Sequence, residues 1–234
     1  MENIDKTDLP PIGYHNLHLD PPEPRWPAIV AVATVGLIHL ALPPSLSVGR
    51  PWLVPAVIVV LIVPTIITHR RGMRTLNRVL GYITSSVLTL FLIWSLTLLV
   101  HAMIAGTEKA PTMLASAAAL WVGNVLIFAL WYWRLDAGGP NGRDLTAGHR
   151  HGAFLFPQMT EEGENSREEH RDRPLWSPQF IDYLFLAFNT STAFSPTDAP
   201  VLSRWAKVLT MIQSAISLTV IALLAARAVN ILGT

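Results

Sequence analysis

The chain contains no cysteine and few charged residues. Of its 234 residues only 14% are Asp, Glu, Lys or Arg, while 51% are hydrophobic. A soluble domain carries roughly 25% charged residues. The lack of cysteine excludes disulfides, thiol catalysis and thiolate metal sites. The net charge is +1 and no basic stripe is present, so nothing indicates a nucleic-acid partner. The composition is instead typical of a membrane protein.

Motifs for catalysis and for cofactor binding are also missing. The sequence has no nucleophile–base pair, no metal motif and no phosphate-binding glycine loop. His149 and His151 stand close together, but two histidines without a third ligand do not predict a metal site. We therefore expect neither an enzyme nor a bound cofactor or metal.

Long apolar runs separate the charged residues. Four such runs cover residues 26–42, 52–68, 79–105 and 113–133. A membrane-spanning helix needs roughly 17–25 mostly apolar residues. A centrally placed Asp, Lys or Arg would cost about 2.5–3.5 kcal/mol on insertion. We therefore predict a four-helix transmembrane region over residues 26–134.

Polar segments flank this region and set its orientation. Residues 1–25 are rich in acids and prolines and are expected to form a disordered polar tail. Residues 135–178 contain glycines and an acidic run and are expected to form a charged soluble loop. Four arginines lie between residues 70 and 78, and short arginine-rich loops stay in the cytoplasm. These signals predict a multi-pass protein of the inner (plasma) membrane.

The last quarter of the chain holds an unusual apolar segment. Phe180 to Ala193 is only 14 residues long, which is marginal for a span and typical of a re-entrant helix. A final long helix is expected over residues 203–232. The predicted fold is thus an all-α, polytopic membrane protein with five or six transmembrane segments. The fifth segment is either a full span or a re-entrant pore helix, and both alternatives remain open.

Residues 179–234 resemble the pore-loop module of potassium channels with two transmembrane helices: a pore helix, a selectivity filter and an inner helix. The filter of that family reads Thr-x-Thr-Thr-Val-Gly-Tyr-Gly-Asp. The whole chain also resembles a family of uncharacterised bacterial integral membrane proteins that share this C-terminal region. The positions that carry the channel resemblance are Asp182-Tyr183, Thr190, Thr192, Asp198, Pro200 and Arg204.

The filter-like segment departs from the potassium pattern. Ala193 replaces a threonine, and Phe194-Ser195-Pro196-Thr197 replaces Val-Gly-Tyr-Gly. A filter lined by backbone carbonyls needs the conformational freedom of glycine. We therefore expect a filter of another type, in which hydroxyl groups and a ring of carboxylates line the path. The residues concerned are Thr190, Thr192, Phe194, Ser195, Pro196, Thr197 and Asp198.

Orientation conflicts with the resemblance. If the arginine loop is cytoplasmic, two further spans return residue 135 to the cytoplasm, whereas the loop before a potassium-channel pore helix is extracellular. Three solutions remain open. The positive-inside rule fails here, or residues 180–198 cross the membrane fully, or the pore loop enters from the cytoplasm.

The leading hypothesis is a channel-like protein, a cation-conducting pore in a homo-oligomer, whose partners are the lipid bilayer, further copies of the chain and a monovalent cation. One alternative is a non-conducting scaffold or partner-binding membrane protein. Another is an ion-coupled transporter that uses Asp198, Arg227 and His101. Arg227 is the charge deepest in the last apolar run, where it either snorkels to the interface or pairs with a carboxylate such as Asp182. Asp182 also suits a helix N-terminus.

Overall fold

The structure is a computed structural model that describes residues 23–47, 49–50, 52–144, 152–159, 176–192 and 199–232. In these ranges the regular secondary structure is helical, and one isolated antiparallel bridge joins Phe154 and Val201. The predicted all-α class is therefore confirmed for the described residues. The long helices are α1 (Trp26–Ala41), α2 (Leu53–Arg70), α3 (Arg74–Ala105), α4 (Ala110–Leu135) and α8 (Arg204–Leu232), and shorter helices are α5 (Pro140–Arg143) and α7 (Phe180–Thr192).

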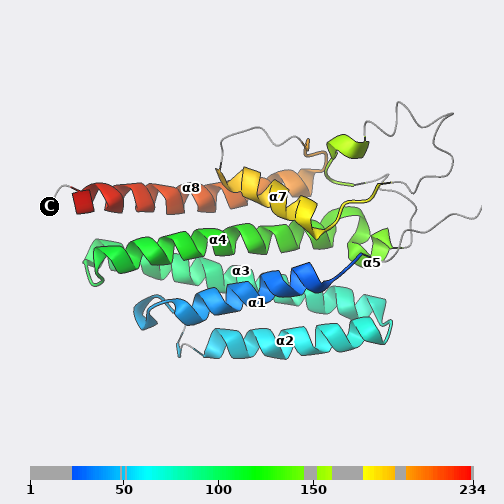
Figure 1. Cartoon of the computed structure of the whole chain (residues 1–234), viewed down its shortest axis with the longest axis horizontal. Coiled ribbons are helices and arrows are strands. Elements are labelled where there is room, and N and C mark those ends of the chain that lie inside the picture. The colour runs from blue at the N-terminus through cyan, green and yellow to red at the C-terminus, as the bar shows by residue number, and fades with distance from the viewer. Residues whose placement is uncertain are drawn as a thin grey trace, which may run out of the picture.

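Helix boundaries follow local sequence signals. The helix α1 begins with a proline in its first turn and ends two residues before Pro43. The helix α3 ends at Gly106, whose φ of 65° is a left-handed conformation that glycine adopts without strain. The helix α2 continues through Pro64, which lies inside it. The turns between α2 and α3 and between α3 and α4 are short, so these neighbours are antiparallel (Figure 1).

The helix α4 is the centre of the bundle. It packs against α1, α3, α7 and α8 (Figure 1). Its most apolar stretch is 61% buried, against 17% for α2 and for α8, which lie at opposite edges. Its fully buried residues include Leu120, Ile127 and Leu130. The apolar core therefore surrounds α4, and α8 turns most of its surface outward.

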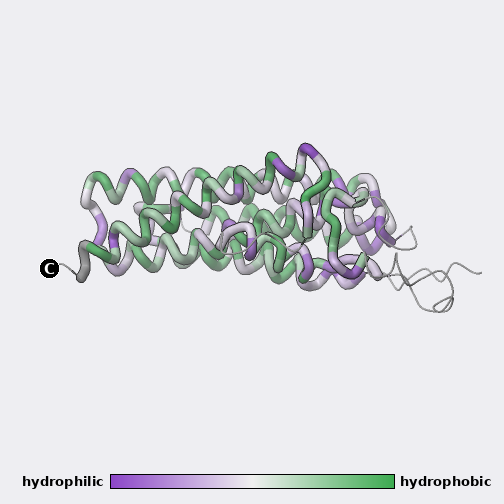
Figure 2. Tube along the Cα trace, turned by 90° about the horizontal axis from the view of Figure 1, so that it is seen from above, coloured by the Kyte–Doolittle hydropathy of each residue, from purple (hydrophilic) through white to green (hydrophobic). Residues whose placement is uncertain are grey.

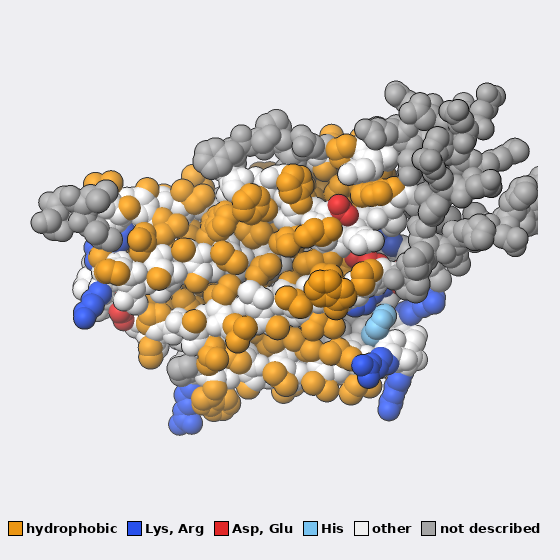
Figure 3. Space-filling view, in the orientation of Figure 1, with side chains coloured by type: hydrophobic (Ala, Val, Ile, Leu, Met, Phe, Trp, Pro, Cys, Tyr) orange, Lys and Arg blue, Asp and Glu red, His pale blue; other side chains and the backbone are white. Residues whose placement is uncertain are grey.

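The outer surface is apolar along most of the length of the bundle. Large side chains such as Val60, Leu90 and Leu218 are exposed by 66–69%. Hydrophobic residues follow the helices over their middle parts (Figure 2), and a broad hydrophobic band lies between charged ends (Figure 3). Among the described residues, four helices are long and apolar enough to cross a membrane, and α1 is a shorter apolar helix. These features fit a multi-pass membrane protein.

One end of the bundle collects most of its arginines. The start of α1, the end of α2, the start of α3 and the end of α4 all lie there (Figure 1). We call it the arginine end; its residues are Arg25, Arg70, Arg71, Arg74, Arg78, Arg134 and Arg143. The opposite end holds the turn between α3 and α4 and the last turns of α8.

Candidate functional site

The helix α7 and the helix α8 start at the same end of the bundle. The backbone N–H of Phe180, the first residue of α7, donates to Glu23 Oε1 at 2.8 Å, just before α1. The ring of Phe154 lies 6.3 Å from Tyr183 of α7 and 6.1 Å from Trp205 of α8. The chain thus runs inward along α7 from the arginine end and is back at that end when α8 begins (Figure 1).

The inner end of α7 is bonded to the middle of α8. Gln213 Nε2 donates to the carbonyl oxygen of Ala187 at 2.6 Å and to Ser191 Oγ at 2.7 Å. Ser214 Oγ donates to the carbonyl oxygen of Thr190 at 3.4 Å. Gln213 lies nine residues after Arg204, so it is about 14 Å along the helix. That is close to half of a hydrocarbon core of about 30 Å.

Polar side chains from three helices meet at this depth. Gln213 Oε1 accepts a hydrogen bond from the hydroxyl of Tyr132 on α4. Asn124 Nδ2, also on α4, donates to Ser217 Oγ and to the carbonyl oxygen of Gln213, both at 3.3 Å. We call Asn124, Tyr132, Ser191, Gln213 and Ser217 the amide cluster; all five side chains are buried. Within the described residues the Oδ1 oxygen of Asn124 accepts no hydrogen bond.

Two of the predicted filter-like residues are described, and both lie at the inner end of α7. Thr190 Oγ1 donates to the carbonyl oxygen of Leu186 at 2.8 Å, and Thr192 Oγ1 donates to that of Asn189 at 3.1 Å. Both threonines are half-buried. Each hydroxyl therefore bonds to its own helix, and the hydroxyl of Thr190 also interacts with that of Tyr132. The predicted residues Phe194, Ser195, Pro196, Thr197 and Asp198 lie outside the described residues.

The two supporting residues predicted from sequence are far apart. Asp182 Oδ2 accepts a hydrogen bond of 2.8 Å from the backbone N–H of Gln179, the residue before α7, so it caps the helix start. Arg227 lies in the last turns of α8, at the opposite end of the bundle (Figure 1). The structure therefore does not bring these two side chains together. His101 also lies near that opposite end, exposed on α3.

A network at the arginine end holds α7 against α4 and was missed in the sequence. Glu23 Oε1 accepts from Trp133 Nε1 at 2.6 Å as well as from Phe180, and its Oε2 pairs with Arg143 at 3.0 Å. Glu23 also pairs with Arg25, whose other partner is Asp144. Burial lowers the pKa of Arg25, and the two carboxylates partly offset this effect.

The buried carboxylate of Asp136 extends this network. Its Oδ2 accepts from the hydroxyl of Tyr183 at 2.6 Å, and its Oδ1 accepts from the backbone N–H of Ala153. Arg143 Nη1 donates to the carbonyl oxygens of Trp133 and Asp136, each at 3.0 Å, and its guanidinium lies 5.1 Å from the ring of Tyr183. The glycine pair before Pro140 was the one sequence signal for the sharp turn that brings Arg143 back onto α4.

Comparison with known proteins identifies no relative. No family model, curated protein or solved structure matches the chain. Within the described residues, no three side chains of His, Asp or Glu lie close enough together to hold a metal ion.

Proposed function

We propose that the chain is a channel-like membrane protein, in which α7, the filter-like segment and α8 form a cation pathway in a homo-oligomer. The observation that carries this proposal is the inner end of α7, which stops beside the middle of α8. The last carbonyls of a helix carry a partial negative charge. In membrane transporters the C-terminal ends of half-length helices stabilise bound cations in the same way.

A re-entrant α7 that enters from the cytoplasm fits the geometry best among the three solutions. With 13 residues, α7 is about 20 Å long, which is too short to cross a hydrocarbon core of about 30 Å. The arginine end, from which α7 starts, becomes cytoplasmic by the positive-inside rule. Five helices then cross the plasma membrane and α7 dips into it. The pore loop thus enters from the side opposite to that in potassium channels.

Residues at the inner end of α7 would line the path. The hydroxyl oxygen of Thr192 has lone pairs that can replace water around a monovalent cation, and Thr190, whose hydroxyl also interacts with Tyr132, would line the path beside it. Thr197 would extend this hydroxyl lining, and Asp198 would place a carboxylate ring at its mouth. Phe194, Ser195 and Pro196 would complete a filter that does not use the glycine-dependent potassium geometry.

The position of α7 and α8 at the edge of the bundle supports assembly from several copies. Phe185 on α7 and Met211 and Leu218 on α8 are exposed by 59–70% and point away from their own chain. Ala222 and Ala226 lie one turn apart on α8, and both are exposed. Small side chains allow membrane helices to approach closely. If the symmetry axis of the oligomer lies beside α7 and α8, the filter-like segments of neighbouring copies would surround that axis.

The test is ionic current through purified protein in planar bilayers under asymmetric KCl and NaCl. We expect a cation-selective current whose selectivity falls in Asp198→Asn and whose conductance changes in Thr192→Ala. The control is Thr97→Ala, because Thr97 is exposed on α3 and its hydroxyl also donates to a carbonyl oxygen of its own helix, that of Ile93. A monomer in the bilayer, or equal effects of Thr97→Ala and Thr192→Ala, would contradict the pore.

A non-conducting scaffold is the second candidate, and one observation favours it. The side-chain amide of Gln213 uses its oxygen and both of its hydrogens within the chain. An amide whose oxygen and hydrogens are all bonded within the chain suits a role in helix packing. Oligomers that fold correctly but pass no current in any of these salts would favour the scaffold. The transporter alternative, which uses Asp198, Arg227 and His101, stays a hypothesis, because Asp198 lies outside the described residues.

A further inference from the structure

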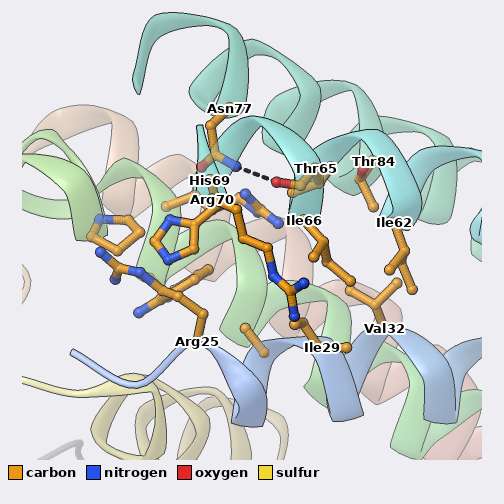
Figure 4. Close-up of a pocket in the computed structure, with 14 residues that line it drawn as sticks. Arg25, Ile29, Val32, Ile62, Thr65, Ile66, His69, Arg70, Asn77 and Thr84 are labelled. Atoms are coloured by element: carbon orange, nitrogen blue, oxygen red, sulfur yellow. Dashed lines mark hydrogen bonds between the residues drawn. The ribbon is translucent and has the colours of Figure 1, made fainter. Parts of the chain in front are cut away.

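A cavity of about 210 Å³ opens at the arginine end between α1, α2, α3 and α4. It is separate from the amide cluster and from the inner end of α7. Figure 4 shows arginines and a histidine at one side and branched apolar side chains at the other. The cavity therefore has two chemically distinct halves.

The apolar half lies in the groove between α1 and α2. Ile29 and Val32 come from α1, and Ile62 and Ile66 come from α2 (Figure 4). Ile29 is 37% exposed, so this wall continues onto the apolar outer surface of the bundle. The groove is thus open to the surface on which lipid chains would lie.

The cationic half carries more positive charge than the described carboxylates neutralise. Arg25 is paired with Glu23 and Asp144. Arg70, which extends from α2 toward α1 (Figure 4), and Arg134 form no ion pair with any carboxylate in the described ranges. The Nε atom of Arg134 is buried and has no hydrogen-bond partner there. Burial of a guanidinium without an anion raises the free energy of the folded protein, so a negatively charged ligand would stabilise this site.

Gly81, which has no side chain, leaves the space that the guanidinium of Arg134 occupies. A Cβ atom at Gly81 of α3 would lie 1.8 Å from Arg134 Nη1, so no larger residue fits there without moving the guanidinium. The guanidinium carbon of Arg134 also lies over the ring of Trp133, 5.4 Å from its centre. Arg134 is therefore held in place by its surroundings before any ligand binds.

We infer that this cavity binds an anionic phospholipid, with its phosphate at Arg70 and Arg134 and the first part of one acyl chain along Ile29 and Ile62. A guanidinium group can bind two phosphate oxygens at once through two parallel hydrogen bonds. Arg70 and Arg134, which form no ion pair in the described ranges, are available for such binding. Basic pockets between membrane helices at the cytoplasmic side suit anionic headgroups, whereas the isoleucines offer nothing to a free ion. A lipid held there connects α1, α2 and α4, whether or not the protein conducts.

The test uses the full-length protein, freed of lipid in detergent and titrated while bound ligand is counted by native mass spectrometry. The probes are phosphatidylglycerol, phosphatidylcholine with the same acyl chains, and inorganic phosphate. We expect phosphatidylglycerol to bind more tightly than phosphatidylcholine. Loss of one cationic group in Arg70→Gln should weaken phosphatidylglycerol binding about fivefold.

The matched control is Arg71→Gln. Arg71 is the neighbouring exposed arginine and does not line the cavity, so its removal should leave the affinity unchanged. Gly81→Ala keeps every charge but displaces the guanidinium of Arg134, and it should also weaken binding. An unchanged helical circular dichroism spectrum would show that the Gly81→Ala variant is folded. Arg70→Gln tests the same site through an exposed side chain.

Three results would overturn the inference. Equal affinities for the two lipids would remove the anionic selectivity. Equal losses in Arg70→Gln and Arg71→Gln would mean that general surface charge attracts the lipid. Displacement of phosphatidylglycerol by an equal concentration of inorganic phosphate would identify the site as one for a free anion.

Discussion

Gln213 on α8 donates a hydrogen bond of 2.7 Å to the hydroxyl of Ser191, near the inner end of α7. The same nitrogen donates its second hydrogen to the carbonyl oxygen of Ala187 at 2.6 Å. One side chain therefore fixes the inner end of α7 to α8. The polar contact has a consequence for stability, because few other polar groups connect these two helices in the described ranges.

Replacement of Gln213 by leucine should detach the end of α7. The substitution leaves the carbonyl oxygen of Ala187 and the hydroxyl of Tyr132 without their partner. We expect the free energy of unfolding to fall by about 1–3 kcal/mol, the usual cost of an unsatisfied buried group. Denaturant unfolding in detergent, followed by circular dichroism, measures this. Thr219→Val, an exposed change on the same helix, is the control, and an equal loss there would contradict the prediction.

Removal of one hydroxyl should loosen the start of α7. In Tyr183→Phe the buried carboxylate of Asp136 loses the donor at 2.6 Å. Hydrogen bonds to charged groups contribute about 1.5–3 kcal/mol, so the unfolding midpoint should fall clearly. Tyr82→Phe removes the same atom from a half-buried tyrosine that stacks on Trp131, and it should have little effect. If both variants unfold alike, the hydrogen bond to Asp136 does not hold α7.

Loss of the Glu23 charge should destabilise the arginine end. Glu23→Gln leaves the buried guanidinium of Arg143 without its carboxylate at 3.0 Å. Breaking a buried ion pair by removing one partner costs about 3–5 kcal/mol. The measurement is again the free energy of unfolding. Glu108→Gln, which changes a carboxylate at the opposite end, is the control, and a loss of similar size there would contradict the prediction.

The absence of cysteine allows a direct test of orientation. Single cysteines at Met73, Thr107 and Ser203 can be labelled in inside-out and right-side-out vesicles with a reagent that does not cross membranes. A re-entrant α7 places positions 73 and 203 on the cytoplasmic side and position 107 on the other. A full crossing by residues 180–198 would move position 203 to the side of position 107. Labelling of position 203 together with position 107 would therefore contradict re-entrance.

Helix positions could be predicted from the apolar runs with small errors. The segment expected over residues 26–42 is α1 over Trp26–Ala41, and the final helix expected over 203–232 is α8 over Arg204–Leu232. The prediction was less accurate at α3, which begins at Arg74 instead of residue 79. Arginine side chains extend toward the interface while their backbone stays helical, so charge marks the membrane boundary but not the helix start.

The network at the arginine end could not be predicted from the sequence. Glu23 and Arg143 are 120 positions apart and stand in segments whose composition is typical of solvated chain. Burial of such charges depends on partners that only the folded bundle brings together. The amide cluster was missed for a related reason, because Asn124 and Gln213 are single polar residues in long apolar runs. Periodicity identifies such runs but does not identify which polar residues face each other.

The contacts of Glu23 also bear on the order in which the protein is made. This residue precedes α1 and is synthesised early, yet Trp133, Arg143 and Phe180 follow it by 110, 120 and 157 positions. Until those residues leave the ribosome, the carboxylate has none of these partners and stays hydrated. The network around Glu23 can therefore be completed only after the chain has been translated as far as Phe180.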